Sequence, residues 1–224
     1  MKKLIIYTLL FLATATSAFA QKDADAKTIL NGVTAKFHSY TNVKADFTLS
    51  ITDPQAGIKQ VQSGTLITQP KDDKFRMTMY SPDSKAEVAQ ELISDGKTQW
   101  TYLKKDKEVQ VSNIDKSGEG MSPAKLFTMY EHGYKYVFTG TQIVGGKICQ
   151  VIDLSPEDAN NEFFKIRLYI DKAKKQIYTA TVFDKGGARY AYTVTTFTAN
   201  APVKDDVYTF DKKNFPGVEV VDLR

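Results

Sequence analysis

The chain has 224 residues and carries 30 Lys and Arg against 26 Asp and Glu, a formal net charge of +4. Basic residues alternate with acidic ones and no block of five like charges occurs, which argues against nucleic-acid binding. One domain with a continuous core fits this length, and the single Cys149 cannot form an intramolecular disulfide. We expect Cys149, within the apolar run 148–154, to be a buried structural thiol.

Residues 1–20 have the features of a cleavable export signal. Lys2 and Lys3 precede an apolar run over 4–15, and Ala18 and Ala20 form a small-residue cleavage site. The run is too short for a retained membrane span, and no cysteine follows the cut for lipid attachment. We therefore expect cleavage after Ala20 and a single exported domain over 21–224. Loss of Lys2 and Lys3 lowers its charge to about +2, close to neutral.

Residues 24–40 are predicted to form an amphipathic helix. Ile29, Val33 and Phe37 recur every four residues, and Leu30 and Tyr40 fill out the same side. His38 lies at the predicted helix end, where a cation favours the helix dipole.

From residue 43 onward the apolar period changes to two, which is typical of strands with one apolar face. Turn residues such as Asp53 with Gly57, and Asp95 with Gly96, separate the runs at short intervals, so antiparallel hairpins are expected. The chain is therefore predicted to be mainly β, with about ten or eleven strands. The alternating apolar positions include Val43, Ala45, Phe47, Leu49, Phe75, Met77, Met79, Trp100, Tyr102, Tyr134, Tyr136, Phe138, Ile166, Leu168, Tyr190 and Tyr192.

A second, short helix is predicted over 123–132. Ser122 supplies an N-cap, Pro123 occupies the first turn, and Gly133 ends an apolar run that contains Leu126 and Met129. A wide antiparallel sheet must curl or be covered to keep its apolar face from water. The two helices are the available covers, so the sequence predicts either a packed core or an incompletely filled cleft.

Motifs for catalysis are absent from the sequence. His38 and His132 are the only histidines, and neither has a partner at metal-ligand spacing. The chain has no G-x-S-x-G elbow, no phosphate-binding glycine loop and no dinucleotide fingerprint. Carboxylates such as Asp153 and Glu157 could pair across a cleft, but any β-rich protein offers such pairs by chance. We expect neither an enzyme nor a cofactor or metal.

Several short motifs, in order, resemble the outer-membrane lipoprotein carrier family of the LolA type over the whole predicted mature chain. The most specific is the hairpin 94–102, with Asp95, Gly96, Trp100 and Tyr102 in the pattern D-G-x-x-x-W-x-Y. The other matches are the helix 26–40 with the strand that follows it, Gly64-Thr65-Leu66 before Pro70, Ser122-Pro123 with Leu126, Leu154-Ser155-Pro156, and the ending that contains Phe210 and Pro216 to Val220.

This resemblance implies an open antiparallel half-barrel with a helical lid over its concave apolar face, which receives the acyl chains of lipoproteins. The family's best-studied members have an Arg before the proline after the second strand, and that Arg holds the lid by hydrogen bonds. This sequence has Gln69 there, so any latch lacks charge and depends on an amide. The predicted acyl-chain site consists of Phe47, Leu49, Phe75, Met77, Met79, Trp100 and Tyr102 on one face of the sheet, with Leu126 and Met129 from the lid.

Two functions follow from the resemblance. The first is a monomeric periplasmic chaperone that takes acylated lipoproteins from an inner-membrane ABC releasing complex and carries them to an outer-membrane acceptor. The second is a module of the same shape that binds or senses another lipid or a lipidated peptide. A plain structural β domain without a cleft is the third alternative, because each predicted site residue is also typical of an ordinary core.

Overall fold

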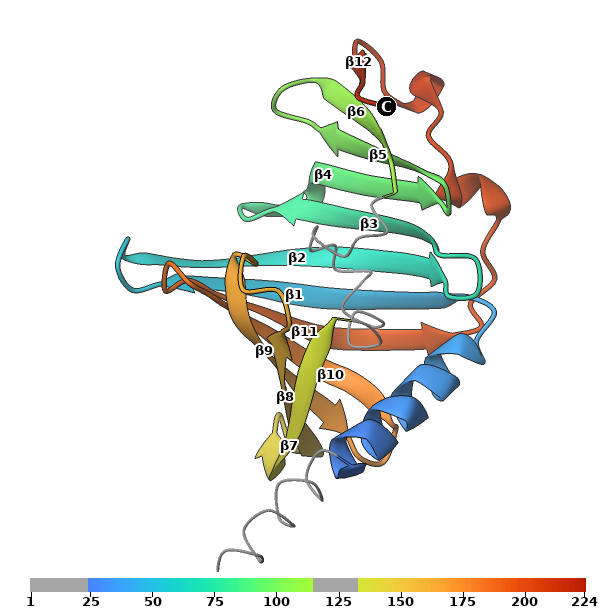
Figure 1. Ribbon diagram of the computed structural model, residues 1–224. Coiled ribbons are helices and arrows are strands. Elements are labelled where there is room, and N and C mark those ends of the chain that lie inside the picture. Colours follow the sequence, from blue (N-terminus) through green and yellow to red (C-terminus); the bar gives the residue numbers. More distant parts are fainter. Residues whose placement is uncertain (1–23, 115–132) are drawn as a thin grey trace, which may run out of the picture.

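The computed structural model describes residues 24–114 and 133–224 (Figure 1). A helix over 24–38 begins the described chain and buries the side chains of Ala26, Leu30, Val33 and Phe37, so the predicted amphipathic helix is confirmed. No helix within the described ranges is long and apolar enough to cross a membrane. The predicted signal segment and the second helix, with Leu126, Met129 and His132, lie outside these ranges.

One sheet of twelve strands forms most of the rest of the described chain. Its order is β12-β6-β5-β4-β3-β2-β1-β11-β10-β9-β8-β7, so that, within the described residues, β12 and β7 are the two edges of an open sheet. The bounds are β1 (Val43–Asp53), β2 (Ile58–Gln69), β3 (Lys74–Ser81), β4 (Ser84–Asp95), β5 (Thr98–Leu103), β6 (Glu108–Asn113), β7 (Tyr134–Val144), β8 (Lys147–Pro156), β9 (Phe163–Asp171), β10 (Gln176–Asp184), β11 (Arg189–Ala199) and β12 (Glu219–Asp222).

The predicted mainly β half-barrel is thus confirmed. Consecutive strands within β1–β6 and within β7–β11 pair antiparallel, as short hairpins require, and β1 pairs antiparallel with β11 to join the two sets. The short β12 pairs parallel with β6 and adds a strand that the sequence did not predict.

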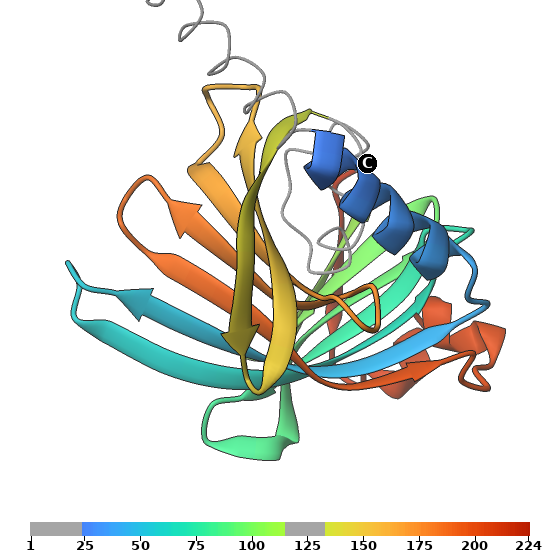
Figure 2. The ribbon, with the colours of Figure 1, turned by 90° about the horizontal axis from the view of Figure 1, so that it is seen from below.

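The sheet curves around the helix, which lies on its concave side (Figure 2). Alternate residues of the strands, such as Phe47, Leu66 and Met77, join the buried helix residues in the main hydrophobic cluster. These strand residues share one face because Ala45 pairs with Leu66 and Leu66 pairs with Met77, and cross-strand partners point the same way. We call this the concave face.

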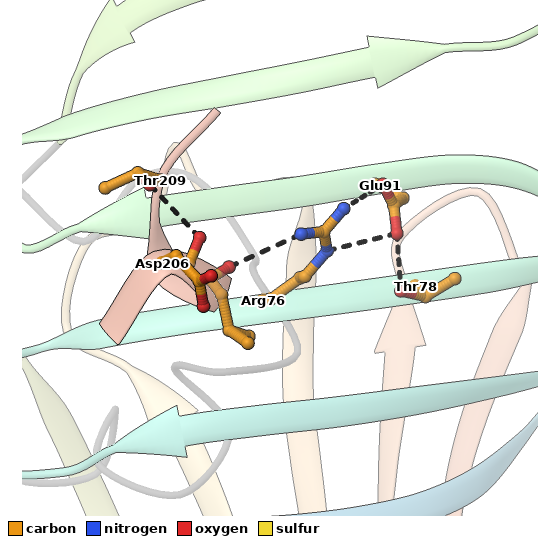
Figure 3. A network of polar contacts seen from close by, with 6 residues as sticks. Arg76, Thr78, Glu91, Asp206 and Thr209 are labelled. Atoms are coloured by element: carbon orange, nitrogen blue, oxygen red, sulfur yellow. Dashed lines mark hydrogen bonds and ion pairs between the residues drawn. The ribbon is translucent and has the colours of Figure 1, made fainter. Parts of the chain in front are cut away.

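The opposite, convex face is covered at β3 to β6 by the C-terminal segment 201–218, which contains the 3-10 helices η3 (Asp205–Tyr208) and η4 (Lys212–Asn214). Arg76 links the segment to the sheet (Figure 3). Its guanidinium forms a bidentate ion pair with Glu91, with 3.2 Å from Nε to Oε1 and 2.7 Å from Nη2 to Oε2. The same guanidinium donates a hydrogen bond to the carbonyl of Val207. Thr78 Oγ1 also donates to Glu91, so the carboxylate is well satisfied.

Candidate functional site

Five of the predicted acyl-chain residues come together on the concave face. Phe47 and Leu49 lie on β1, and Phe75, Met77 and Met79 lie on β3. All five side chains are buried and belong to the same hydrophobic cluster as the helix. Within the described ranges they form packed core, which provides the apolar floor of the concave face.

Trp100 and Tyr102 lie on the other face, and the prediction that they share a surface with Met77 is wrong. The pairing registers of β3 with β4 and of β4 with β5 show which face each side chain occupies. Met77 pairs with Leu92, whereas Trp100 pairs with Ile93, the neighbour of Leu92 on the opposite side of β4. Trp100 and Tyr102 therefore pack on the convex face, in a second hydrophobic cluster with Ile93, Val109, Val111, Phe215 and Val218. Tyr102 meets Phe215 edge-on, with ring centroids 4.7 Å apart.

The accessible part of the concave face lies on β7 and β11, which contain none of the predicted acyl-chain residues. Tyr136 and Phe138 on β7, and Tyr190 and Tyr192 on β11, are half-buried and pack against the main cluster. Tyr136 pairs with Leu154 and Phe138 with Ile152, both fully buried, which places the aromatic pair on the same face. The period-two aromatic pattern was visible in the sequence and could have identified them.

A pocket of about 200 Å³ opens beside Tyr190 and Tyr192. The ring of Phe163 forms one wall and stacks on Tyr134, with centroids 6.4 Å apart and planes 10° apart. The lining residues come from the start of β9 and the residues before it, the end of β10 and the start of β11, which lie at the end of the sheet away from the helix (Figure 2). The lining consists of Asn161, Glu162, Phe163, Val182, Asp184, Tyr190 and Tyr192.

Tyr192 connects the pocket to the core. Its ring lies 6.1 Å from that of Phe47, and burial, with a smaller contribution from Tyr190, raises the pKa of Tyr192 to about 12. The hydroxyl is therefore neutral at any physiological pH. The pocket lining thus combines the aromatic faces of Phe163, Tyr190 and Tyr192, which suit a flexible apolar chain, with the carboxylates of Glu162 and Asp184.

Gln69, at the predicted latch position, is engaged in the β2–β3 turn. Its Nε2 donates to Asp72 Oδ2 at 2.6 Å, while its Oε1 is buried without a hydrogen-bond partner in the described part of the chain. Since Leu66 and Thr68 lie on the concave face, alternation places Gln69 on the convex face. The latch itself involves residues 115–132 and stays a prediction.

Cys149 is buried and free. Burial first, and then the nearby Asp171 carboxylate, raises the pKa of its thiol, which lowers the fraction of reactive thiolate. Among residues 24–114 and 133–224, no group of three or more His, Cys, Asp or Glu side chains is placed to hold a metal ion.

Solved structures with similar folds have low sequence identity to this chain. An uncharacterized conserved protein from Thermus thermophilus superposes with a TM-score of 0.58 at 14% identity, over 88% of this chain and 98% of that one. A domain from Vibrio parahaemolyticus, described as a putative outer membrane lipoprotein-sorting protein, gives 0.48 at 12% identity over 86% and 98%. A LolA superfamily protein from Nitrosomonas europaea gives 0.47 at 10% identity over 83% and 97%.

A search of curated proteins found no match to this chain. The family model described as outer membrane lipoprotein carrier protein LolA matches residues 38–211, from the end of the first helix to the C-terminal segment. That range includes all the strands except β12 and most of the concave face described above. Because the match covers far more than half of the chain, the protein belongs to the LolA family.

Proposed function

We propose that this protein is a periplasmic carrier that binds the acyl chains of lipoproteins on its concave face. It receives them from an inner-membrane ABC releasing complex and delivers them toward an outer-membrane acceptor. Family membership supports this role, and the predicted export signal supports the compartment. The carrier binds its cargo without chemical conversion.

The energetics of acyl chains explain why a carrier is needed. Each buried methylene is worth about 0.8 kcal/mol, so two or three chains of about fifteen carbons cost roughly 25 to 35 kcal/mol to expose to water. A carrier must offer a surface nearly as apolar as the membrane, so that loading and release are both feasible. Flexible side chains that can adapt to a ligand suit acyl chains, because acyl chains have no fixed conformation.

One observation carries the proposal: the concave face is a fully buried apolar floor flanked by half-buried aromatic side chains. Ile152, Leu154 and Leu168 are completely buried, while Tyr136, Phe138 and Tyr192 beside them keep accessible surface. A plain structural β domain would bury such rings against its own chain. Tyr192, together with Tyr190, lines the 200 Å³ pocket, and half-buried aromatic rings at a pocket are typical of a ligand site.

Native mass spectrometry of the protein purified from its own periplasm tests this function. The proposal predicts a complex whose added mass is that of a triacylated protein. A free lipid as the reproducible bound species would favour the binding or sensing module of the same shape and contradict the carrier role. A ligand-free protein in repeated preparations, which also fails to bind a fluorescent acyl probe stoichiometrically, would contradict both.

A further inference from the structure

Strands β10 and β11 separate halfway along their length. They pair only from Thr179 to Phe183 of β10, opposite Arg189 to Thr193 of β11. Beyond that point β10 continues beside β9 and β11 continues beside β1. The hydroxyls of Thr179 and Thr193, 3.2 Å apart, lie at the apex of the resulting wedge. The sheet is therefore open between two central strands, at the end where the helix lies.

A pocket of about 280 Å³ occupies this wedge. It lies at the opposite end of β10 from the aromatic pocket beside Tyr190, and the two share no lining residue among those that the structure describes. Its lining comes from the helix end, the β7–β8 and β9–β10 turns, and the separated strands. The residues are Lys36, Tyr40, Lys147, Asp171, Lys174, Gln176, Ile177, Tyr178, Val194, Thr195, Thr196, Phe197 and Ala199.

The inner part of the wedge pocket is apolar. Ile177 is buried, and Tyr40, Val194 and Phe197 are half-buried members of the main hydrophobic cluster. The rings of Tyr40 and Phe197 lie 5.9 Å apart. An apolar chain that entered here would contact the same core as the helix and would be removed from water.

The rest of the lining includes three lysines, Lys36, Lys147 and Lys174. Lys36 Nζ donates to the carbonyl of Lys174 at 2.6 Å, and Lys147 Nζ lies 5.0 Å from the centre of the Tyr178 ring. Among the described lining residues the only carboxylate is Asp171, and its Oδ1 already accepts from the backbone N–H groups of Ala173 and Lys174. Three ammonium groups against one carboxylate leave a net positive lining that favours an anion.

We propose that the wedge pocket binds an anionic group carried on an apolar chain, such as the carboxylate of a fatty acid or the phosphate of a single-chain lipid. The acid group lies at Lys36, Lys147 and Lys174, and the first part of the chain lies on Tyr40, Ile177 and Phe197. The basic and the apolar part of the pocket both contribute to affinity, because the charged group of the ligand gains hydrogen bonds and its apolar chain is removed from water. This site is separate from the concave-face site of the proposed function.

Titration calorimetry with dodecyl phosphate tests the proposal on the Lys147→Gln/Lys174→Gln variant and, separately, on Lys36→Gln. Both replace charges at the surface and leave the core intact. We expect about a tenfold or greater loss of affinity in the double variant, since charge-assisted hydrogen bonds are the strongest polar contacts. Lys59→Gln/Lys105→Gln, which removes two exposed lysines outside the pocket, is the matched control and should bind like the unmodified protein.

Other probes separate the possible sources of binding. Dodecyl maltoside has the same chain without the charge and should bind the Lys147→Gln/Lys174→Gln variant as it binds the unmodified protein. Inorganic phosphate that binds as tightly as dodecyl phosphate would overturn the proposal, since the apolar half would then contribute nothing. Binding to phosphatidylglycerol vesicles without binding to monomeric dodecyl phosphate would also overturn it, in favour of attraction to a membrane surface.

A last variant distinguishes this site from the concave face. Phe138→Asp introduces a charge among the concave aromatic residues and leaves the wedge pocket unchanged. The proposal predicts that Phe138→Asp retains the lysine-dependent binding of dodecyl phosphate. If the Lys147→Gln/Lys174→Gln variant and the lysine control bind dodecyl phosphate equally, the wedge proposal fails whatever the concave face does.

Discussion

Gly64 shows how one residue shapes the concave floor. It pairs directly with Phe47 across β1 and β2, and the Phe47 ring lies over it. A Cβ added at Gly64 would lie 2.4 Å from Phe47 Cζ, closer than atoms can pack. The motif Gly64-Thr65-Leu66 therefore has a structural reason: the glycine makes room for the ring that, in turn, contacts Tyr192.

We expect Gly64→Ala to destabilise the protein by about 1–3 kcal/mol, because the Phe47 ring must move in a packed core. Urea unfolding measures the loss. Ser63→Ala, one residue away on the convex face, is the control and should change stability by less than about 0.5 kcal/mol. In the Gly64→Ala/Phe47→Leu variant the smaller side chain relieves the clash, so the two effects should not add. Additive losses would refute this explanation of the glycine.

The half-buried aromatic residues predict that a charge on the concave face weakens acyl binding and that a charge on the convex face does not. Phe138→Asp should weaken binding of a fluorescent acyl probe by about tenfold or more, because a charge on the chain's contact surface must be desolvated. Val61→Asp is the matched control: Val61 is 56% exposed and lies on the convex face. Equal effects of the two substitutions, in variants with unchanged unfolding midpoints, would argue against the concave site.

The buried tyrosines predict a loss of stability in alkali. Burial first raises the pKa of both Tyr192 and Tyr208 to about 12, with smaller contributions from Tyr190 and Asp205 respectively. Above a pH of about 10 the unfolded chain loses these protons while the folded chain keeps them. Their contribution to stability is complete below that pH and disappears as the pH rises through about 12.

Urea midpoints measured between about pH 9 and pH 11.5 test this dependence. Tyr192→Phe should reduce the slope of stability against pH relative to the unmodified protein, because the group responsible is gone. Tyr178→Phe, a half-buried tyrosine of the wedge pocket, serves as the comparison for loss of a hydroxyl. An unchanged slope in Tyr192→Phe would show that burial of Tyr192 does not perturb its ionisation.

At the scale of elements, alternation in one strand does not tell which face of the sheet is apolar. On β3 the apolar residues point to the concave face, and on β5 and β6 they point to the convex face. Strand β4 is the point of change, since Leu92 joins the concave cluster and Ile93 the convex one. The convex face of β5 and β6 can be apolar because the C-terminal segment covers it with Phe215 and Val218.

The position of Trp100 on the convex face predicts how its fluorescence responds to a bound acyl chain. Trp100 is the single tryptophan of the chain. A bound acyl chain that carries bromine atoms should leave Trp100 emission unchanged, because the sheet separates the two. In a Trp100→Phe/Phe138→Trp variant the same chain should quench the emission. Quenching of Trp100 in the unmodified protein, at ligand concentrations that saturate one site, would place the chain on the convex face instead.

The mainly β class and the first helix of the molecule were predictable from the sequence pattern, and the open half-barrel was predicted from the resemblance to the LolA family. The period changes from four to two at Val43, and the turn residues divide the strands clearly. The site was only partly predictable, because membership of a face depends on register. Register placed Phe47 and Met77 together, Trp100 apart from them, and Tyr136 and Tyr192 at the accessible surface. The parallel β12 follows from pairing across more than a hundred residues, which no local pattern reveals.

The proposed function requires the acyl chains of a lipoprotein to lie on the concave face. Photocrosslinking with a lipoprotein whose acyl chains carry a diazirine, followed by peptide mapping of the crosslinked sites, tests this position. We predict crosslinks to the peptides that contain Tyr136 and Phe138, and to those that contain Tyr190 and Tyr192. Crosslinks concentrated at Trp100, Phe215 and Val218, the cluster on the convex face, would show that the acyl chains do not lie on the concave face.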